Sequence, residues 1–436
     1  MEGPALITFL VGWTTGLRQA SFPAAWAWGK KMKKLIAAAF AITVAPPAWG
    51  DEPDGLILPA GFHATVVAEG LGAIRHLAVR GNGDIFVSTR HGAGQPTNGI
   101  IALRLGPDHK AVQTTHFSDV DQGTGIRFHL GYLYASSNNA VYRFAFNAND
   151  LVPPAAPEAI VTGLPNSNHA IAFDEHGGLY VSVDAGGNIC TDPKAPKDAK
   201  PVGLKPCPLL EGRAGVWRFS DTKTGQNFAS GEHYATGIRN MSAMDWRGND
   251  ALYGAMHGRD GTHNAFPDVV STSDDDAIGD EMHRVVKGTD FGWPYSYYDG
   301  ARKVRLLAPE YGGDGKTKAE GDRPVVSFQP ERPAVLDLAF YSGRKFPPRY
   351  RGGAFIAMHG GEGDGSHAGY NIVFVPFSSR AGTPAVFADG FAGPSPDDRN
   401  VKRAAYRPLG LAVGPDGALY VADSTKGRIW RIAYGE

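Results

Sequence analysis

Histidine, arginine and asparagine occur immediately before several short apolar segments of this sequence. The residues are Arg75, His76, His169, Arg239, Asn240 and Arg407. A histidine can act there as a general base, because its pKa lies close to neutral pH. Arginine presents a planar fork of donors that suits carboxylates, and asparagine adds a donor and an acceptor. If these side chains converge, they fit an anionic ligand; otherwise they cap turns or line a water-filled channel.

The segment from His257 to Glu281 combines acids and glycines in a way that suits a hard cation. Asp260, Asp280 and Glu281 carry the carboxylate oxygens that Ca²⁺ prefers. The spacing does not match the helix-flanked calcium loop, so a solvated acidic loop is the alternative. Residues 288–300, GTDFGWPYSYYDG, follow directly. Their aromatic rings would flank a planar ligand or pack in the core.

A repeated sequence pattern indicates which elements position these side chains. An apolar strand, a turn with Gly, Asn or Asp, and a second strand recur six times, at 76–89, 125–137, 169–183, 241–257, 336–359 and 409–423. Most copies are followed by a third strand, and several are preceded by a fourth that ends in glycine. Four strands at such a period form one propeller blade. The sequence therefore predicts an all-β fold, a six-bladed β-propeller of four-stranded antiparallel blades.

The repeat leaves the closure of the ring open. Residues 62–70, FHATVVAEG, resemble the outer strands that precede other blades, and they would alternatively complete the last blade by pairing with RIWRIAY near the C-terminus. Longer, irregular insertions occupy 184–212, 257–280, 293–333 and 360–369. Insertions of this kind leave blade ends and collect on one face, where they build sites. The stretch 293–333 is predicted to be an excursion over that face.

The first fifty residues are predicted to lie outside the fold. Four lysines between 30 and 34 precede the apolar run LIAAAFAITVA, and small residues precede Asp51. This pattern is typical of a secretory signal peptide over 32–50 with cleavage near Gly50 and Asp51, which makes 1–31 an upstream extension and 51–436 the propeller domain. The alternative is a membrane anchor, but the apolar run is shorter than the ~20 residues that a spanning helix needs. We expect a periplasmic or secreted protein, not stably inserted in a membrane.

Charge and cysteine content narrow the class further. The 43 Lys and Arg residues against 44 Asp and Glu give a net charge of −1, so no basic excess points to nucleic acid as a partner. The two cysteines, Cys190 and Cys207, suggest one disulfide in an exported chain. It would tie down the insertion between them. Free thiols and a metal pair are the alternatives.

Several segments, taken together and in order, resemble the soluble, pyrroloquinoline-quinone-dependent sugar dehydrogenases, the glucose/sorbosone dehydrogenase family. The likeness is closest to the L-sorbosone dehydrogenase branch and covers roughly residues 58–434. The segments are LPAGFHATVVAEGL, GLPNSNHAIAFDEHGGLYVSVDAGGNIC, GIRNMSAMDW, GDEMHRVVKGTDFGWPY, FPPRYRGGAFIAMHG and YRPLGLAVGPDGALYVAD. The resemblance implies a six-bladed propeller with pyrroloquinoline quinone (PQQ) lying over the channel mouth.

The resemblance also implies roles for individual residues. His169 matches the base that takes the proton from the sugar hydroxyl while hydride passes to the quinone. Arg239 matches the arginine that polarises the quinone carbonyls, and Asn240 matches the neighbouring cofactor contact. Arg407 matches an arginine that holds the cofactor carboxylates. His359 lies near the place of a lysine that contacts the quinone in some members.

A second group of positions relates to the metal. Gly258 and Arg259 match a Gly-Pro pair whose main-chain carbonyls ligate the cofactor-bound Ca²⁺, with Arg259 in place of the proline. Ala405 does not concern the metal: it occupies the position at which the family has a second arginine that holds the cofactor carboxylates. Ca²⁺ would polarise the quinone as a Lewis acid and fix its orientation.

These observations favour a PQQ- and Ca²⁺-dependent oxidoreductase that acts on an aldose or a sorbosone-like sugar. No haem-attachment CxxCH is present in the sequence, so electrons would leave to a separate acceptor of the cytochrome or quinone type. One alternative is a calcium-dependent hydrolase of the lactonase type, which needs several channel-facing carboxylates. The other is a non-catalytic binding propeller, because fold alone does not settle function.

Overall fold

The computed structural model describes residues 49–51, 55–90, 99–120, 122–196, 199–329, 332–361 and 367–435. The chain divides into two units, residues 1–46 and 47–436, and every described element belongs to the second. The predicted upstream extension and nearly all of the predicted signal peptide lie outside the described residues. Within the described ranges, no helix is both long and apolar enough to cross a membrane.

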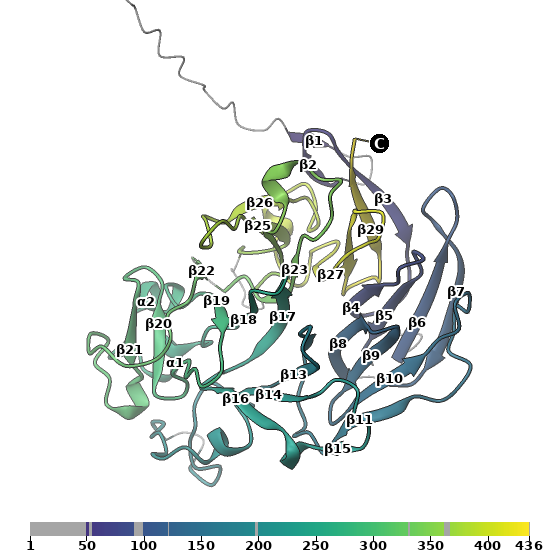
Figure 1. The fold of residues 1–436 in the computed structure, drawn as a ribbon. Helices are drawn as coiled ribbons and strands as arrows, with labels where there is room; N and C mark the ends of the chain where they lie inside the picture. Colours follow the sequence, from purple (N-terminus) through teal and green to yellow (C-terminus); the bar gives the residue numbers. More distant parts are fainter. Residues whose placement is uncertain are drawn as a thin grey trace, which may run out of the picture. The chain divides into compact units, whose positions relative to one another are not determined.

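Six sheets form a six-bladed β-propeller, as predicted (Figure 1). The strands of blades 1 to 3, from the inside outwards, are β4 (Ile74–Val79), β5 (Ile85–Thr89), β6 (Gly99–Leu105) and β7 (Ala111–Ser118); β8 (Gln122–His129), β9 (Tyr132–Ser137), β10 (Val141–Ala145) and β11 (Glu158–Thr162); and β12 (Ile171–Phe173), β13 (Gly178–Val183), β14 (Gly215–Ser220) and β16 (Glu232–Thr236).

The remaining blades repeat this order. Their strands are β17 (Met241–Arg247), β18 (Ala251–Met256), β19 (Asp280–Val285) and β22 (Val326–Phe328) in blade 4; β23 (Val335–Phe340), β24 (Ala354–Met358), β25 (Asn371–Val375) and β26 (Ala385–Ala388) in blade 5; and β27 (Pro408–Val413), β28 (Leu419–Asp423), β29 (Ile429–Tyr434) and β3 (Phe62–Ala68) in blade 6. Because all blades run in the same direction, the six inner strands begin at one end of the ring, which we call the upper face.

Tight turns between the two inner strands repeat from blade to blade. In blades 1, 3 and 6 the same main-chain bond closes the turn, from Arg80 N to Asp84 O (2.8 Å), Asp174 N to Gly178 O (3.1 Å) and Gly414 N to Ala418 O (2.9 Å). Gly83, Gly177 and Gly417 take φ of +92°, +83° and +79° in these turns. Residues with a side chain rarely adopt such values. The glycines of the repeated pattern therefore determine where the hairpin turns form.

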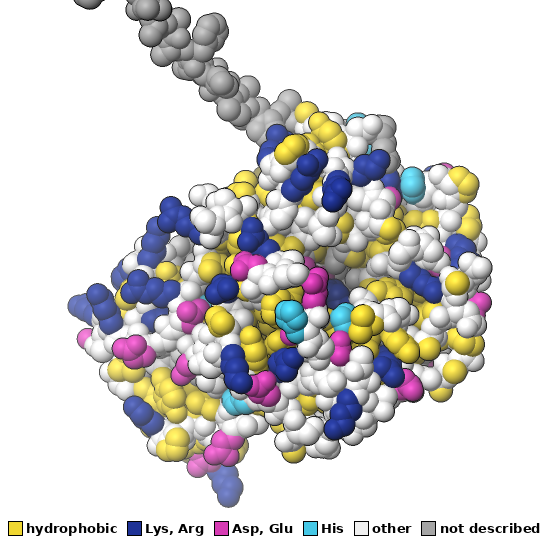
Figure 2. All heavy atoms as spheres, in the orientation of Figure 1, with side chains coloured by type: hydrophobic (Ala, Val, Ile, Leu, Met, Phe, Trp, Pro, Cys, Tyr) yellow, Lys and Arg dark blue, Asp and Glu magenta, His cyan; other side chains and the backbone are white. Residues whose placement is uncertain are grey.

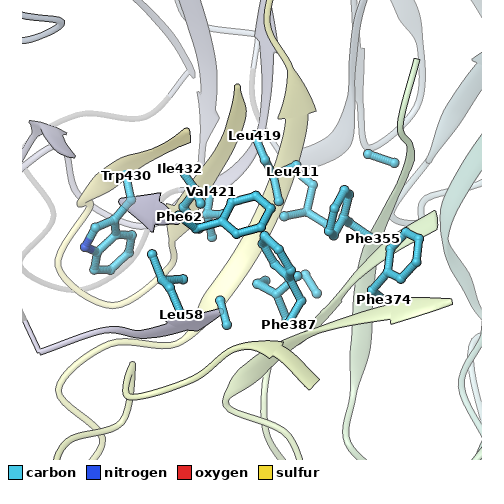
Figure 3. Packing of buried hydrophobic residues seen from close by; sticks show 14 of the residues in the cluster. Leu58, Phe62, Phe355, Phe374, Phe387, Leu411, Leu419, Val421, Trp430 and Ile432 are labelled. Carbon is cyan, nitrogen blue, oxygen red and sulfur yellow. The ribbon is translucent and has the colours of Figure 1, made fainter. Parts of the chain in front are cut away.

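The ring closes between the two ends of the propeller. Strand β3 pairs antiparallel with β29, with Phe62 opposite Tyr434 and Ala68 opposite Ile429. Residues 62–68 therefore complete the last blade, which decides between the two possibilities that the sequence left open. Figure 3 shows the Phe62 ring beside Phe387 in the core that joins blades 5 and 6; their ring centroids lie 5.0 Å apart in an edge-to-face arrangement.

Three features go beyond the predicted pattern. Strand β22 lies inside the predicted excursion 293–333, so the end of that segment is a blade strand. A fifth strand, β15 (Gln226–Asn227), pairs in parallel with β11 at the edge of blade 2. The short elements outside the blades are β1 (Trp49–Asp51), β2 (Ile57–Pro59), β20 (Ser296–Asp299), β21 (Val304–Leu307), α1 (Thr262–Ala265), α2 (Thr272–Asp276) and the 3₁₀ helices η1 (Pro208–Glu211), η2 (Phe228–Ser230), η3 (Pro309–Tyr311), η4 (Pro348–Tyr350) and η5 (Pro396–Asp398).

The predicted cleavage site falls inside one of these elements. Strand β1 pairs with β2, with Gly50 opposite Leu58 and Asp51 opposite Ile57. Cleavage between Gly50 and Asp51 would leave only the last residue of β1 on the propeller.

Buried polar side chains join neighbouring blades near the channel. The bonds run from Ser136 Oγ to His169 O (2.7 Å), from Ser242 Oγ to Val335 O (2.8 Å), from Phe340 N to Asp245 Oδ2 (2.8 Å) and from Leu411 N to Asp337 Oδ2 (2.8 Å). Buried hydrogen bonds in a low-dielectric interior hold their partners firmly. The inner strands of these neighbouring blades are therefore fixed relative to one another.

Candidate functional site

His169 precedes the inner strand of blade 3 and is fully buried. Its Nδ1 lies 2.7 Å from Ser182 O, and its Nε2 lies 3.1 Å from Asn138 O. A neutral imidazole carries one hydrogen, and we assign it to Nδ1, which makes the shorter contact. Burial lowers the pKa of His169 below its ordinary value of 6.5. The ring is therefore neutral at pH 7, with the Nε2 lone pair facing the Asn138 carbonyl oxygen.

The surroundings of Nε2 suit a side chain that accepts a proton. A proton taken up there would face the Asn138 carbonyl oxygen, which already lies at hydrogen-bonding distance. Nδ1 would keep its bond to the Ser182 carbonyl, because that bond exists in both protonation states. The carbonyl at Nδ1 fixes the tautomer and ring orientation, as the partner of a catalytic histidine does.

Arg239 follows β16 and is held by two segments that do not belong to the blades. Its Nε donates to Asn188 Oδ1 at 2.8 Å, and its Nη2 donates to Asp260. Asn188 also accepts from the Asp260 main-chain N at 3.1 Å, and the indole Nε1 of Trp293 donates to the Asn188 carbonyl at 3.0 Å. The main-chain carbonyl of Asn240, the next residue, accepts a bond from the His257 main-chain N at 2.9 Å.

Arg407 is held by main-chain carbonyls at the end of β24. Its Nη2 donates to Gly360 O at 2.8 Å and its Nε to His359 O at 3.3 Å. The His359 ring contacts Ser424 Oγ through Nε2 at 2.7 Å. Burial is the main reason that the pKa of His359 lies well below its ordinary value of 6.5, and the charges of Arg407 and Arg75 lower it further. The two arginines thus gather positive potential at the upper face, beside a neutral His359.

The two carboxylates predicted near the metal are bonded within the protein. Asp280 accepts from Gly258 N at 3.0 Å and from Val335 N at 2.8 Å, which joins blades 4 and 5. Glu281 contacts Arg305 Nη2 at 2.6 Å. In the part of the chain that the structure describes, no group of three or more His, Cys, Asp and Glu side chains could hold a metal ion. Ligation by the main-chain carbonyls of Gly258 and Arg259 would not require these carboxylates.

The charge of Glu281 is stabilised by its neighbours. Burial alone would raise its pKa, but Arg305 and His283 outweigh burial, so the pKa of Glu281 lies below its ordinary value. His283 Nε2 lies 3.0 Å from the Glu281 carboxylate, and His283 Nδ1 lies 2.9 Å from Asp322. Glu281 is therefore ionised at neutral pH as part of a buried ionic network.

The Arg259 side chain has incompletely bonded donors although it is only 4% exposed. Its Nη2 pairs with Glu310 at 3.0 Å, while Nε and Nη1 have no hydrogen-bond partner. It lines a cavity of about 10 Å³, enough for one water molecule. The other lining residues are Arg239, Met256, His257, Gly258, Ile278, Glu281, Phe291, Trp293, Ser296, Tyr297 and Arg305. One water molecule in this cavity would satisfy part of the hydrogen-bonding capacity of the orphaned guanidinium donors beside Arg239.

The structure brings most of the predicted site residues together. Arg239, Gly258, Arg259 and Glu281 line one cavity, and His257 lies in its wall. His169 stands apart: among the described residues, no contact joins it to Arg239 or Arg407. Figure 2 shows histidine and acidic side chains near the middle of the face that it presents, with lysine and arginine side chains around them.

The predicted disulfide between Cys190 and Cys207 is present. Both cysteines are buried in a small apolar cluster that includes Trp293, and the Cys207 main-chain N donates to the Tyr295 hydroxyl at 2.9 Å. The disulfide-closed insertion therefore packs against the Trp-Pro segment and carries Asn188 to Arg239. Sequence reasoning singled out this aromatic string but missed Asn188, because nothing marks one asparagine of a loop as the partner of an arginine.

Comparisons with known proteins agree on the fold. The calcium structure of Trichoderma reesei Carbohydrate-Active Enzymes Family AA12 superposes with a TM-score of 0.69 at 17% identity, covering 87% of this chain and 97% of that one. The holo PQQ domain of Coprinopsis cinerea pyranose dehydrogenase gives 0.68 at 17% identity, with coverages of 88% and 98%. The PQQ-bound aldose sugar dehydrogenase of Streptomyces coelicolor gives 0.53 at 19% identity, with coverages of 86% and 99%.

Sequence comparison gives a partial relative and a family. A curated protein of Borreliella burgdorferi, described as uncharacterized, is 26% identical over 209 residues, which are 47% of this chain and 49% of the relative. The chain thus spans about half the length of that relative. The model of the TrAA12-like family matches residues 56–435, which include all six blades. This chain therefore belongs to the TrAA12-like family.

Proposed function

We propose that this protein is a PQQ- and Ca²⁺-dependent oxidoreductase that oxidises an aldose or a sorbosone-like sugar. The observation that carries the proposal is the concentration of arginine side chains at the upper face, where Arg75 and Arg407 lie near the neutral ring of His359 and Arg239 and Arg259 line one small cavity. PQQ carries three carboxylates and an ortho-quinone, which suit such surroundings. The names of the structural neighbours, among them PQQ-bound, holo and calcium structures, support the same cofactors.

Bound PQQ would supply the electron sink that accepts hydride from the sugar. Arg407 and His359 would hold its carboxylates, and Arg239 and Asn240 would contact its quinone carbonyls. The main-chain carbonyls of Gly258 and Arg259 would ligate Ca²⁺. Arg259 also has orphaned donors toward the cavity next to Arg239.

His169 would act as the general base. Its Nε2 would take the proton of the substrate hydroxyl once that hydroxyl replaces the Asn138 carbonyl oxygen as the neighbour of Nε2. Because the pKa of His169 is lowered, Nε2 is unprotonated at neutral pH, and kcat/KM should fall only as the pH drops through that lowered value. The electrons would then pass to a separate acceptor of the cytochrome or quinone type, in the periplasm or outside the cell.

Titration of chelator-treated protein with PQQ and Ca²⁺, followed by dye reduction with aldoses and L-sorbosone, tests the proposal. We expect saturable PQQ binding and sugar-dependent reduction. Absence of PQQ binding would refute the proposal and favour the hydrolase and binding-propeller alternatives. PQQ binding without reduction of the dye by any of the sugars would refute the proposed substrate class.

The His169→Gln variant tests the base separately. We expect turnover to fall by about 100- to 10,000-fold, the usual contribution of a general base, while PQQ affinity is unchanged. The acid limb of the kcat/KM profile should disappear with the side chain. Unchanged turnover with the same acid limb would exclude His169 as the base.

A further inference from the structure

Two insertions pack against each other outside the blades, and we call the surface that their exposed side chains form the basic platform. The first insertion is the disulfide-closed loop 190–207, and the second is the segment 301–320, which contains β21 and η3. Gly203 N donates to Glu310 O at 3.0 Å and so joins the two. Figure 1 shows β20 and β21 at the edge of the ring, outside blade 4.

Lysine side chains dominate the exposed charge of the platform. The first insertion contains four lysines and two aspartates, and the second contains five basic and three acidic residues, whereas the whole chain has a net charge of −1. Of its exposed acids, Asp192 and Asp314 accept bonds from the main-chain N of Lys194 and Lys316. Among the residues that the structure describes, no carboxylate forms an ion pair with the platform lysines. These lysines are Lys194, Lys200, Lys205, Lys303, Lys316 and Lys318, and all are exposed.

Two of these lysines lie over aromatic rings. Lys205 Nζ lies 5.7 Å from the centre of the Tyr295 ring, and Lys200 Nζ lies 5.9 Å from the centre of the Phe266 ring. An ammonium group within ~6 Å of a ring centre is attracted to the ring face. The two side chains are therefore partly ordered before a partner binds, which reduces the entropy that binding costs.

An apolar side chain stands between the lysines of the first insertion. Val202 is 74% exposed, more than any other large hydrophobic side chain among the described residues. An apolar contact within a charged rim is the arrangement of many protein–protein interfaces. Binding to a lipid surface needs an extended apolar face, which one valine does not provide. The platform therefore fits an acidic protein surface better than a membrane.

The platform is joined to the candidate site at the base of the first insertion. Asn188, two residues before Cys190, accepts from Arg239 Nε at 2.8 Å. At the other end of the loop, the Cys207 main-chain N donates to the Tyr295 hydroxyl at 2.9 Å. A protein bound to the platform would therefore rest on the loop that holds Arg239. This is the place where an electron acceptor is needed, because the proposed oxidation leaves two electrons on the cofactor.

We infer that the basic platform docks a soluble electron-transfer protein with an acidic surface, which accepts the electrons of the sugar oxidation. The inference rests on the proposed function. Each docked molecule takes one electron, so two molecules reoxidise one reduced cofactor, and two protons are released to water. Val202 makes the apolar contact, and the lysines around it pair with carboxylates of the partner. Because these charges are exposed, salt weakens the attraction.

Interferometry with the full-length chain and two forms of cytochrome c tests the surface directly, without cofactor or sugar. Succinylation converts the lysines of cytochrome c into carboxylates and keeps the haem. We expect the succinylated form to bind saturably at an ionic strength of about 0.05 M, at least about tenfold more tightly than the unmodified, basic form, and to dissociate at about 0.3 M. Equal affinities for the two forms, or no saturable binding of the succinylated form, would overturn the inference.

Two triple variants locate the surface. Lys194→Glu, Lys200→Glu, Lys205→Glu should weaken binding of the succinylated form about 10- to 100-fold, because three attractive contacts become repulsive. The control reverses the same amount of charge at the opposite end of the ring, in Lys110→Glu, Lys223→Glu, Lys345→Glu, where all three lysines are also exposed. Equal losses in the two variants would show that only net charge matters and would refute the docking site.

Turnover separates this inference from the proposed function. In protein loaded with PQQ and Ca²⁺, the platform variant should reduce succinylated cytochrome c at least about tenfold more slowly with sugar, while reduction of the small, uncharged 1,4-benzoquinone is unchanged. Failure of the original protein to reduce benzoquinone would contradict the proposed function, whatever the binding data show. Reduction of both acceptors at unchanged rates by the platform variant would refute the docking site alone. Binding of the platform to phosphatidylglycerol vesicles but not to the succinylated cytochrome would assign the surface to a membrane instead.

Discussion

The candidate site has two halves that are built differently. In the half formed by blades 5 and 6, Arg407 donates to the main-chain carbonyls of His359 and Gly360 at the end of a blade strand. In the half formed by blades 3 and 4, Arg239 is held by the side chains of Asn188 and Asp260, which lie on insertions. One half relies on the backbone of the propeller, and the other relies on loops added to it.

The fold determines the orientation of Arg407, whereas substitutions in the insertions can change the orientation of Arg239. Main-chain carbonyls persist whatever residue occupies the position, so the orientation of Arg407 follows from blade geometry. Side-chain partners change with one mutation, so the orientation of Arg239 depends on Asn188, on the Trp293 contact and on the disulfide that closes the insertion. We therefore expect perturbations of the insertions to alter one half and spare the other.

The largest effect is expected from removal of the disulfide. The double variant Cys190→Ser, Cys207→Ser opens a loop with a sequence separation of 17 residues, which should lower the free energy of unfolding by about 3 kcal/mol. Urea unfolding measures the change. PQQ affinity should fall as well, because the insertion carries Asn188. An unchanged unfolding midpoint would show that the buried packing around Trp293 suffices without the covalent link.

The next effect is expected from Arg239→Met. It removes charge-assisted hydrogen bonds to the proposed cofactor, worth about 2 kcal/mol, so PQQ should bind about 30-fold more weakly in a fluorescence titration. Arg247→Met is the matched control, because Arg247 ends β17, the inner strand that Arg239 precedes, at the opposite face. Equal losses in the two variants would point to a general effect on blade 4 rather than to a contact with the cofactor.

A smaller effect is expected from Asn188→Ala. The arginine keeps its charge but loses one orienting hydrogen bond, so PQQ affinity should fall about fivefold, equivalent to about 1 kcal/mol. Asn166→Ala is the control, because Asn166 is exposed and contributes only its main-chain carbonyl to Arg213. A loss as large as that of Arg239→Met would mean that orientation matters as much as charge.

The smallest effect is expected from Asp260→Asn, and its sign is opposite. The Asp260 side chain is 62% exposed, so its ion pair with Arg239 contributes less than about 1 kcal/mol. Without this competing carboxylate, PQQ should bind a few-fold more tightly at low ionic strength, and the gain should shrink in salt. Weaker binding would show that Asp260 positions Arg239 rather than competing with the ligand.

The fold could be predicted almost completely because a blade is a local pattern. Each strand pair is specified by alternation and a glycine turn, as in residues 76–89 and 409–423, and six copies imply closure. Strand β22 was missed because three residues, Val326–Phe328, are too few to show alternation. The closing pair β3 and β29 remained open because pairing between distant segments depends on contacts that no local pattern records.

The site was predicted less completely for the same reason. Residues at the starts of inner strands, such as Arg239 and Arg407, inherit their place from the repeat. Their partners do not, because Asn188 and Glu310 reach the site through insertions of irregular length. The environment of His169 was also invisible in the sequence: its full burial and the carbonyls at both ring nitrogens appear only after blades 2 and 3 are packed together.

The closure of the ring by β3 and β29 has a consequence for the order of folding. Strand β3 is the first blade strand to be synthesised, and its partner is the last. Until β29 emerges, Phe62 lacks its partner on the closing strand, and the edge of β3 remains unpaired, which favours aggregation of incomplete chains. The other five blades are encoded by continuous segments apart from the insertions, so they can form as the chain grows. Assembly of the sixth blade waits for the end of synthesis.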